Sequence, residues 1–197
     1  MYILGVTGNM GSGKSTVSQR FSELGAVVSH ADDLAKELLQ NDSNILNQLA
    51  QRFGSDILDG SGQLQRQLLA ERAFATREDQ QFLNHLLHPE VRRATLLRIN
   101  DARQKSTPLF VIDAPLLFEA GVDSITDSVL VVTADKMLRQ GRVEHRSQIT
   151  EADFERRDRL QLSIEEKISR ADHVIYNNGS LVELLTQVDN FYQALKL

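Results

Sequence analysis

A glycine-rich loop close to the start of the chain constrains the fold more than any other feature. The segment Gly8–Ser15 reads Gly-Asn-Met-Gly-Ser-Gly-Lys-Ser and matches the pattern G-x-x-x-x-G-K-[ST] at every fixed position. An apolar run, Tyr2–Thr7, precedes the loop, and an amphipathic helical pattern follows it from about Lys14 to Leu24. The pattern arises by chance in roughly one chain in a hundred of average composition. A strand, this loop and a helix in that order predict a phosphate-binding loop.

The residue types in this loop suit phosphate. Glycines let the loop curl until its backbone N–H groups point at phosphate oxygens, and the helix that follows adds the positive end of its dipole. Lys14 is expected to reach the β- and γ-phosphates of a nucleotide, and the Ser15 hydroxyl is expected to ligate Mg²⁺. The expected ATP-binding residues are Gly11, Ser12, Gly13, Lys14, Ser15 and Thr16.

Five short apolar runs predict buried strands. Three of them are rich in valine and isoleucine and lack in–out alternation, as expected when both faces of a parallel sheet are covered. Because helical patterns lie between the runs, the sequence predicts a three-layer α/β fold with a five-stranded, mostly parallel sheet. The runs are Tyr2–Thr7, Ala26–Ser29, Leu109–Asp113, Ser128–Thr133 and Asp172–Tyr176.

The second and third runs are separated by a long, almost wholly helical stretch. The apolar face of one predicted helix ends at Phe53. The dipeptide His88-Pro89 suggests a break before another helix, Val91 to Arg103. A parallel crossover needs only about a dozen residues. We therefore expect the surplus, residues 55–104, to form a helical subdomain inside a single domain that spans residues 1–197.

Basic residues gather after the fourth run. Thr150 and Asp153 have the spacing of a helix cap, so residues 138–160 are expected to form a helix, a turn and a second helix. Such a segment suits a mobile lid that closes arginines onto phosphates. Interleaved acidic residues also fit a solvated helical surface, which is the better interpretation for any single arginine. The six arginines are Arg139, Arg142, Arg146, Arg156, Arg157 and Arg159.

Two aspartates follow predicted strands. Asp32 comes directly after the second strand, at the edge of the sheet where ligands collect, and can accept a hydroxyl proton there. A helix N-cap is the alternative for Asp32, and Asp33 could fill that position instead. Asp113 ends the third strand as a Walker B aspartate does, although a turn or cap role is equally open. The histidines lack metal-ligand spacing, so no zinc site is expected.

Composition excludes several classes of function. The 197 residues include no cysteine, which rules out disulfides, thiolate nucleophiles and cysteine-based metal centres. A net charge of −5 makes nucleic acid an improbable main partner. The N-terminus has neither a basic start nor a long apolar stretch, so no signal peptide or membrane anchor is expected. We expect a cytoplasmic protein, a monomer, with a homo-oligomer as the alternative.

Several further motifs carry a resemblance to a known family. Along nearly its whole length the chain resembles the dephospho-coenzyme A kinase family. The P-loop alone is shared by many families, whereas the His-Pro, P-L-L-F-E and post-lid elements in combination are more specific. The matching segments are Thr7–Ser15, Ala31-Asp32, Leu83-Asn84 with His88-Pro89, Pro115–Glu119, Gln140 with Arg142, Arg157 with Gln161, Lys167 with Ala171-Asp172, and Asn177–Gly179.

The resemblance implies a reaction and a set of site residues. It implies that ATP, with Mg²⁺, phosphorylates the ribose 3′-hydroxyl of dephospho-CoA to give CoA and ADP. It favours Asp32 over Asp33 as the general base and adds Lys14 and Arg142 as catalytic residues. It also implies that the helical subdomain at 55–104 holds dephospho-CoA. The implied substrate-binding residues are His88, Leu116 and Glu119.

The chain departs from the family pattern at three places. The family often reads D-A-D where this chain has His30-Ala31-Asp32, and often has arginine where this chain has Lys36. The frequent Gly-Ile of the P-loop is Asn9-Met10 here, at positions where the motif needs no particular side chain.

Two other functions remain open at this point. Another small-molecule kinase, of nucleoside or shikimate type, would share the loop, lid and sheet. A nucleotide-dependent switch or assembly protein is the alternative from a different class. GTPase switches use an N/T-K-x-D motif to read the base, and Thr133-Ala134-Asp135-Lys136 has those letters in the wrong order.

Overall fold

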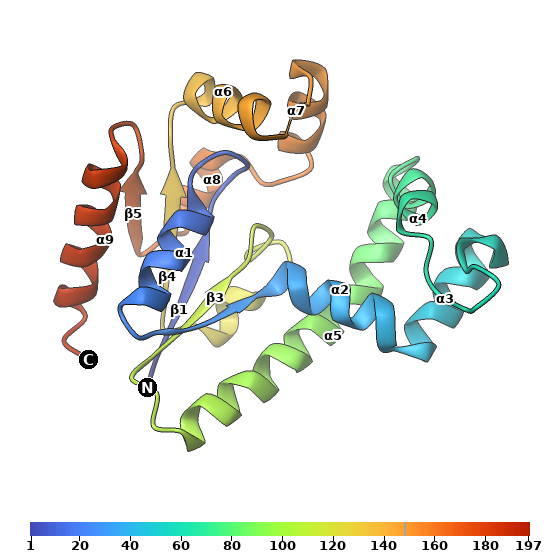
Figure 1. Ribbon diagram of the computed structural model, residues 1–197, viewed down its shortest axis with the longest axis horizontal. Coiled ribbons are helices and arrows are strands. Elements are labelled where there is room, and N and C mark those ends of the chain that lie inside the picture. Colours follow the sequence, from blue (N-terminus) through green and yellow to red (C-terminus); the bar gives the residue numbers. More distant parts are fainter. Residues whose placement is uncertain (148) are drawn as a thin grey trace. The chain divides into compact units, whose positions relative to one another are not determined.

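The computed structural model describes residues 1–147 and 149–197 (Figure 1). The chain divides into two compact units. The first unit combines Met1–His30 with Arg98–Leu197, and the second comprises Ala31–Leu97. Among the described residues, no helix has both the length and the apolar character needed to cross a membrane.

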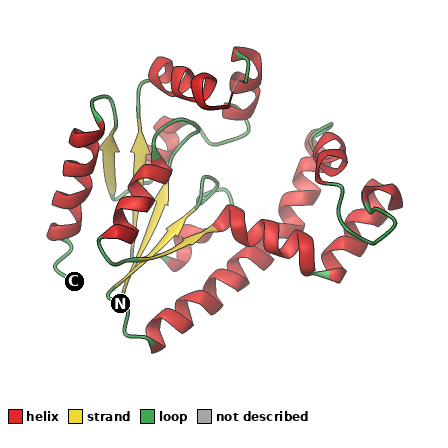
Figure 2. Ribbon diagram, in the orientation of Figure 1, coloured by secondary structure: helices red, strands yellow, loops and turns green. Residues whose placement is uncertain are grey.

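A five-stranded parallel sheet forms the centre of the first unit (Figure 2, yellow). Its strand order is β2-β3-β1-β4-β5, and every neighbouring pair is parallel, which confirms the predicted fold class. β2 lies one residue later than predicted and β5 begins one residue later. The strands are β1 (Tyr2–Thr7), β2 (Val27–His30), β3 (Leu109–Asp113), β4 (Ser128–Thr133) and β5 (His173–Tyr176).

Helices surround this sheet, and several begin at caps that the sequence indicates. Ser180 and Glu183 form a complete capping box at the start of α9, and Thr150 accepts a hydrogen bond from the Asp153 backbone at the start of α7. The helices of the first unit are α1 (Lys14–Glu23), α6 (Lys136–Ser147), α7 (Glu151–Asp158), α8 (Ile164–Ser169), α9 (Leu181–Ala194) and a short 3₁₀ segment, η2 (Val122–Ile125).

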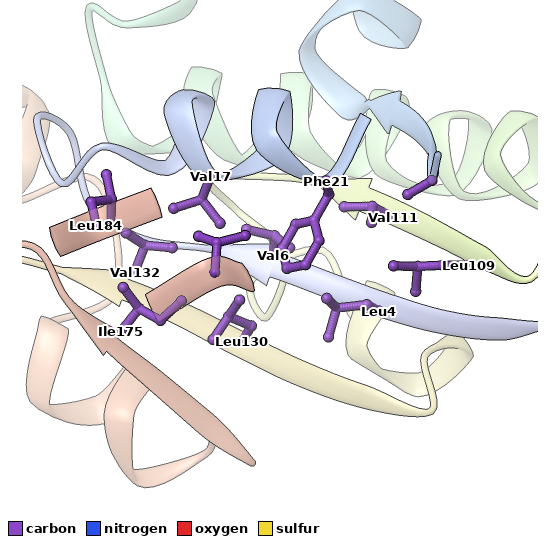
Figure 3. Close-up of a cluster of buried hydrophobic side chains, with 12 residues drawn as sticks. Leu4, Val6, Val17, Phe21, Leu109, Val111, Leu130, Val132, Ile175 and Leu184 are labelled. Atoms are coloured by element: carbon purple, nitrogen blue, oxygen red, sulfur yellow. The ribbon is translucent and has the colours of Figure 1, made fainter. Parts of the chain in front are cut away.

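Both faces of the sheet are buried. On one face, α1 and α9 cover side chains of β1, β3, β4 and β5, with Phe21 of α1 fully buried among them (Figure 3). The intervening strand residues, among them Phe110 and Val131, are also fully buried. This double covering explains why the central strands β1, β3 and β4 are buried along nearly their whole length, whereas the edge strands β2 and β5 also carry exposed residues. The core thereby fixes the carboxyl edge of the sheet, from which the P-loop emerges.

The second unit is entirely helical. Ile45, Leu49 and Phe53 on one helix share a hydrophobic cluster with Leu69 and Leu83 on two others. Because α3 packs in this cluster, the unit begins well before residue 55, the start predicted for the helical subdomain. Its elements are α2 (Ala31–Asn41), α3 (Ser43–Phe53), η1 (Ser55–Ile57), α4 (Arg66–Ala73) and the first part of α5 (Arg77–Gln104).

The predicted helix break at His88-Pro89 is wrong. α5 runs without interruption for 28 residues with Pro89 inside it. Proline removes one backbone hydrogen bond from the helix. Leu83, Leu87 and Val91, spaced four residues apart, are all buried on either side of the proline. Packing of this continuous apolar stripe outweighs the lost bond, so the helix continues.

Candidate active site

The P-loop joins β1 to α1 in a tightly curled conformation. Gly11 and Gly13 have φ values of 81° and 96°, a region that side-chain-bearing residues rarely adopt. A side chain at either glycine would also collide with its surroundings, at Gly11 with the backbone of Arg139 and at Gly13 with the amide of Asn177. Glycine is therefore required at positions 11 and 13 both by backbone geometry and by close packing.

The curled loop presents backbone donors together. Ser12 N–H bonds to the Asn9 carbonyl at 3.1 Å and Thr16 N–H to the Gly13 carbonyl at 3.0 Å, which closes the loop onto the first turn of α1. Among the described residues, no acceptor bonds the backbone N–H groups of Gly11, Gly13, Lys14 and Ser15. Free N–H groups at a helix N-terminus, aided by the helix dipole, form a binding site for anionic oxygens.

A buried carboxylate lies beside the P-loop lysine. Asp113, at the end of β3, is 3% exposed and accepts a hydrogen bond from Lys14 Nζ on one oxygen. Its other oxygen lies 2.9 Å from His30 Nδ1. The sheet register explains this arrangement, because Asp113 is paired with Val6 of β1 on one side and with His30 of β2 on the other. The sequence did not predict the two nitrogen groups, Lys14 Nζ and His30 Nδ1, that contact Asp113 in the structure.

Asp32 and Asp33 belong to the second unit, in the first turn of α2. Both are exposed, and carboxylates in a first helical turn interact favourably with the helix dipole. Asp33 accepts a hydrogen bond from Lys36 Nζ at 2.7 Å, and this bond raises the pKa of Lys36. Helix α2 starts at Ala31, so both aspartates lie inside the helix and not at its N-cap. His88 lies in α5, also within the second unit.

Two of the lid-segment arginines have protein partners around the P-loop. Arg139 of α6 is 3% exposed, donates to the Met10 carbonyl at 3.2 Å, and pairs with Asp158 at 2.7 Å. Arg142 Nη2 donates to the Asn177 carbonyl at 2.9 Å. Arg156 is instead exposed and forms a surface pair, which is the alternative that the sequence left open for single arginines.

Asp158 is held as an anion by its neighbours. Burial acts to raise the pKa of this carboxyl, but hydrogen bonds and attraction from Arg139, with a further bond from Asn9, outweigh burial, and the pKa is lowered. The carboxylate thus accepts from a guanidinium and an amide at the junction of α6, α7 and the P-loop.

The segment that follows β3 is tied to α8. Glu119 Oε1 accepts from Leu162 N–H at 2.8 Å and lies 3.5 Å from Lys167 Nζ. Lys167 is fully buried and donates to the Pro115 carbonyl at 2.7 Å. Burial lowers the pKa of Lys167, and the nearby Glu119 carboxylate opposes that effect. Glu119 Oε2 is buried without a hydrogen-bond partner among the described residues, and Leu116 is half-buried in the same turn.

Sequence reasoning gave no role to Asn177, which proves to support the P-loop. Its Nδ2 donates to the Ser12 carbonyl at 2.8 Å, and its backbone N–H bonds to the Thr133 carbonyl at 2.7 Å. The only sequence signal was its place in the Asn-Asn-Gly element that follows β5. The contact joins residues 165 positions apart, so no local pattern could reveal it.

Comparison with known proteins decides between the alternatives that the P-loop leaves open. A protein-family model described as Dephospho-CoA kinase matches residues 2–183. The chain belongs to the dephospho-CoA kinase family. Membership gives it dephospho-CoA kinase activity, the ATP-dependent final step of coenzyme A biosynthesis. The nucleotide switch and the other small-molecule kinases are thereby set aside.

Relatives within the dephospho-CoA kinase family match almost end to end. The dephospho-CoA kinase of Corynebacterium diphtheriae is 41% identical over 180 residues, which are 91% of this chain and 90% of the relative. That of Syntrophotalea carbinolica is 40% identical over 188 residues, 95% of this chain and 89% of the relative. Family membership therefore applies to the chain as a whole.

Solved structures agree with this membership. The dephospho-CoA kinase of Campylobacter jejuni superposes with a TM-score of 0.74 at 26% identity, covering 98% of this chain and 96% of that one. The protein TT1252 of Thermus thermophilus gives 0.83 at 35% identity, with coverage of 98% and 96%. The shikimate kinase of Acinetobacter baumannii, at 15% identity and a TM-score of 0.52, covers 100% of this chain and 96% of its own and shares the fold alone.

The donors that this family member offers to a metal suit magnesium. Ser15 supplies an exposed hydroxyl at the start of α1, and Asp113 supplies a carboxylate at the end of the strand beside β1. Within the described part of the chain, no group of three or more acidic, histidine or cysteine side chains could cage an ion. Mg²⁺ in kinases is held by one or two protein oxygens plus substrate phosphates, which this set of oxygen donors fits.

Proposed function

We propose that the chain transfers the γ-phosphoryl group of ATP to the ribose 3′-hydroxyl of dephospho-CoA, giving CoA and ADP. The observation that carries this proposal is the family match over residues 2–183 together with a curled P-loop whose lysine contacts a buried carboxylate. The family supplies the acceptor, and the loop geometry supplies a site for the phosphates of the donor.

Each proposed role follows from the chemistry of the group. The backbone N–H groups of Gly11 to Ser15 would bind phosphate oxygens, and Lys14 would leave Asp113 to neutralise the β- and γ-phosphates. Positioning and charge neutralisation of this kind account for most of the catalysis of phosphoryl transfer. Thr16, in the first turn of α1, completes the proposed nucleotide site.

The acceptor side of the proposal involves Asp32, Arg142 and three further residues. Asp32 is proposed as the general base that accepts the proton of the 3′-hydroxyl. Arg142 is proposed to contact the transferring phosphoryl group from a lid at 138–160. The second unit is proposed to bind dephospho-CoA through His88. Leu116 and Glu119, in the turn after β3 of the first unit, are proposed as further substrate-binding residues.

Magnesium is the proposed metal. The Ser15 hydroxyl would ligate it, and Asp113 would hold it through water. When bound, the ion would neutralise charge on the ATP phosphates. The proposed location is the cytoplasm, where ATP is available as the phosphoryl donor, and the proposed assembly is a monomer; light scattering of the purified protein tests the latter.

A substrate panel tests the reaction. Purified protein with Mg-ATP should form ADP at a substantial rate with dephospho-CoA and at background rate with nucleoside monophosphates or shikimate. The product should carry its new phosphate on the 3′-oxygen, which phosphorus NMR distinguishes from other positions. Turnover of a nucleoside monophosphate or shikimate in place of dephospho-CoA would refute the proposal.

The general base is tested by a matched pair of substitutions. Asp32→Asn keeps the shape of the side chain but removes its proton-accepting charge, so kcat should fall about a hundredfold or more with ATP affinity nearly unchanged. Asp33→Asn, one position along the same exposed helical turn, should retain kcat within about threefold. Equal kcat values for Asp32→Asn and the unsubstituted protein would remove Asp32 from the role.

A further inference from the structure

Asn9 makes contacts that the P-loop motif does not require. It occupies a position of the loop where the motif sets no side chain, yet it is 3% exposed. Its Nδ2 lies 3.3 Å from Asp158 Oδ1 and 3.3 Å from the Leu162 carbonyl. The first half of the P-loop is therefore hydrogen-bonded to the last residue of α7 and to the segment that links α7 to α8.

Arg139 reaches the same carboxylate from the other end of the lid segment. Its Nη1 is 2.7 Å from Asp158 Oδ1 and its Nη2 is 3.3 Å from Oδ2, a two-pronged contact between a guanidinium and a carboxylate. The same Nη1 donates to the Met10 carbonyl at 3.2 Å. Phe154 of α7 lies under the guanidinium, with its ring centroid 5.6 Å away. One end of α6, one end of α7 and the P-loop thus meet at a single carboxylate.

These contacts are more than a surface ion pair. The Arg139 side chain is 4% exposed and the Asp158 side chain 17% exposed, so water and salt screen the pair far less than an exposed one. A cavity of about 710 Å³ borders the group, and Asn9, Arg139 and Asp158 all line it.

We propose that Asn9, Arg139 and Asp158 form a clasp that fixes both ends of the lid segment α6–α7 to the P-loop and couples the lid's position to the nucleotide in the loop. The inference rests on the proposed nucleotide site. All three are positioning residues, since their hydrogen bonds join them to one another and to the Met10 and Leu162 carbonyls. Binding of phosphate by the loop would orient the peptide between Met10 and Gly11, and Arg139 would transmit that change to α6.

Asn9 is the most informative position, because it departs from the glycine that the family often has. Asn9→Ala removes both side-chain hydrogen bonds and adds no group that the loop must accommodate. A lost hydrogen bond costs about 0.5–1.5 kcal/mol, so ATP affinity should fall roughly three- to tenfold. Asp158→Asn weakens the pairing with Arg139 and should lower ATP affinity about tenfold or more.

The test measures ATP affinity by calorimetry and backbone amide exchange of residues 136–160 with and without ATP. In the unsubstituted protein, ATP should slow exchange in this segment. In Asn9→Ala and Asp158→Asn the slowing should shrink, and the double variant should lose less affinity than the product of the single losses. All measurements use the full-length protein, and each variant is first checked for a circular dichroism spectrum that matches that of the unsubstituted protein.

Asp189→Asn is the matched control. Asp189 pairs with Arg20 at 2.7 Å and also joins two helices of the first unit, α1 and α9, but it touches neither the P-loop nor the lid segment. This variant should keep both ATP affinity and the ATP-dependent slowing of exchange. If Asp189→Asn lost as much ATP affinity as the clasp variants, any weakened contact between helices would have the same effect. The clasp would then be refuted.

The remaining outcomes separate the clasp from the function on which it rests. If the unsubstituted protein binds ATP and both clasp variants match it in affinity and exchange, the clasp is wrong and the proposed function stands. If the unsubstituted protein does not bind ATP, the proposed nucleotide site and the clasp are both overturned. Additive losses in the double variant would also overturn the clasp, because they would show two independent contacts.

Discussion

Lys167 provides a stringent test of how the site is supported. Its ammonium is fully buried, donates to the Pro115 carbonyl at 2.7 Å and lies 3.5 Å from Glu119 Oε1. Lys167→Met keeps a long flexible side chain but removes the charge. Removing one partner of a buried ion pair costs about 3–5 kcal/mol, because the other charge is left uncompensated.

The local contacts place the expected loss at the lower end of that range. The Glu119 side chain is 16% exposed and still accepts a hydrogen bond from the Leu162 N–H in this variant. Its negative charge therefore keeps some contact with water and one hydrogen-bond donor. We therefore expect Lys167→Met to lower the free energy of unfolding by about 3 kcal/mol. Replacing both charges, as Lys167→Met with Glu119→Gln, should recover most of this loss. The Pro115 carbonyl still accepts from Thr7 Oγ1 at 3.2 Å in both variants.

The pH dependence gives a second readout with a defined sign. Burial lowers the pKa of Lys167 in the folded protein below its ordinary value of 10.5. Between the lowered value and 10.5, the unfolded chain binds more protons than the native one, so this group's contribution to the free energy of unfolding rises with pH. Below the lowered pKa the ammonium is charged in both states, and the burial penalty is at its largest.

Urea unfolding followed by circular dichroism measures both effects. The difference in free energy of unfolding between the unsubstituted protein and Lys167→Met should be about 3 kcal/mol near neutral pH and should grow as the pH approaches 10. Asp189→Asn, which breaks a half-exposed pair, should cost less than about 1 kcal/mol. A loss below about 1 kcal/mol for Lys167→Met, with no dependence on pH, would refute the reasoning.

Two further substitutions probe the loop and the sheet. Lys14→Ala should abolish measurable turnover and weaken ATP binding at least tenfold, since it removes the cation proposed for the β- and γ-phosphates; calorimetry showing unaltered affinity would contradict this. Gly5→Ala places a methyl carbon 2.7 Å from Leu117 Cδ1 and 3.1 Å from Thr126 Cγ2 on the central strand β1. This overpacking should lower the free energy of unfolding by about 1–3 kcal/mol, and an unchanged urea midpoint would count against it.

Local patterns predicted most of the fold. The three central strands, β1, β3 and β4, were visible because strands covered on both faces are continuous apolar runs. The helix start at Thr150 was visible because a cap is a relation between residues three positions apart. The P-loop was visible because its chemistry fixes glycines, a lysine and a serine at constant spacing. Each of these signals is contained within one short segment.

Features that depend on distant contacts were missed. The break expected at Pro89 failed because the buried stripe of α5 depends on packing against other helices, which the sequence around the proline does not specify. The Asn177–Ser12 contact spans 165 positions and the Arg139–Asp158 pair spans 19. Among six lid arginines, no local feature distinguished buried Arg139 from exposed Arg156, because burial is decided by the surrounding fold.

Two of the departures from the family pattern, His30 and Asn9, can now be explained by contacts. His30 Nδ1 lies 2.9 Å from Asp113 Oδ2, a distance at which an imidazole N–H can donate a hydrogen bond to the carboxylate. An aspartate at position 30 would instead set two carboxylates side by side at the ends of paired strands. Asn9 likewise donates to the carboxylate of Asp158. Both unusual residues thus place a side-chain nitrogen against a carboxylate that flanks the P-loop, Asn9 against Asp158 and His30 against Asp113. The carboxylates therefore account for the residue type at each of these two positions.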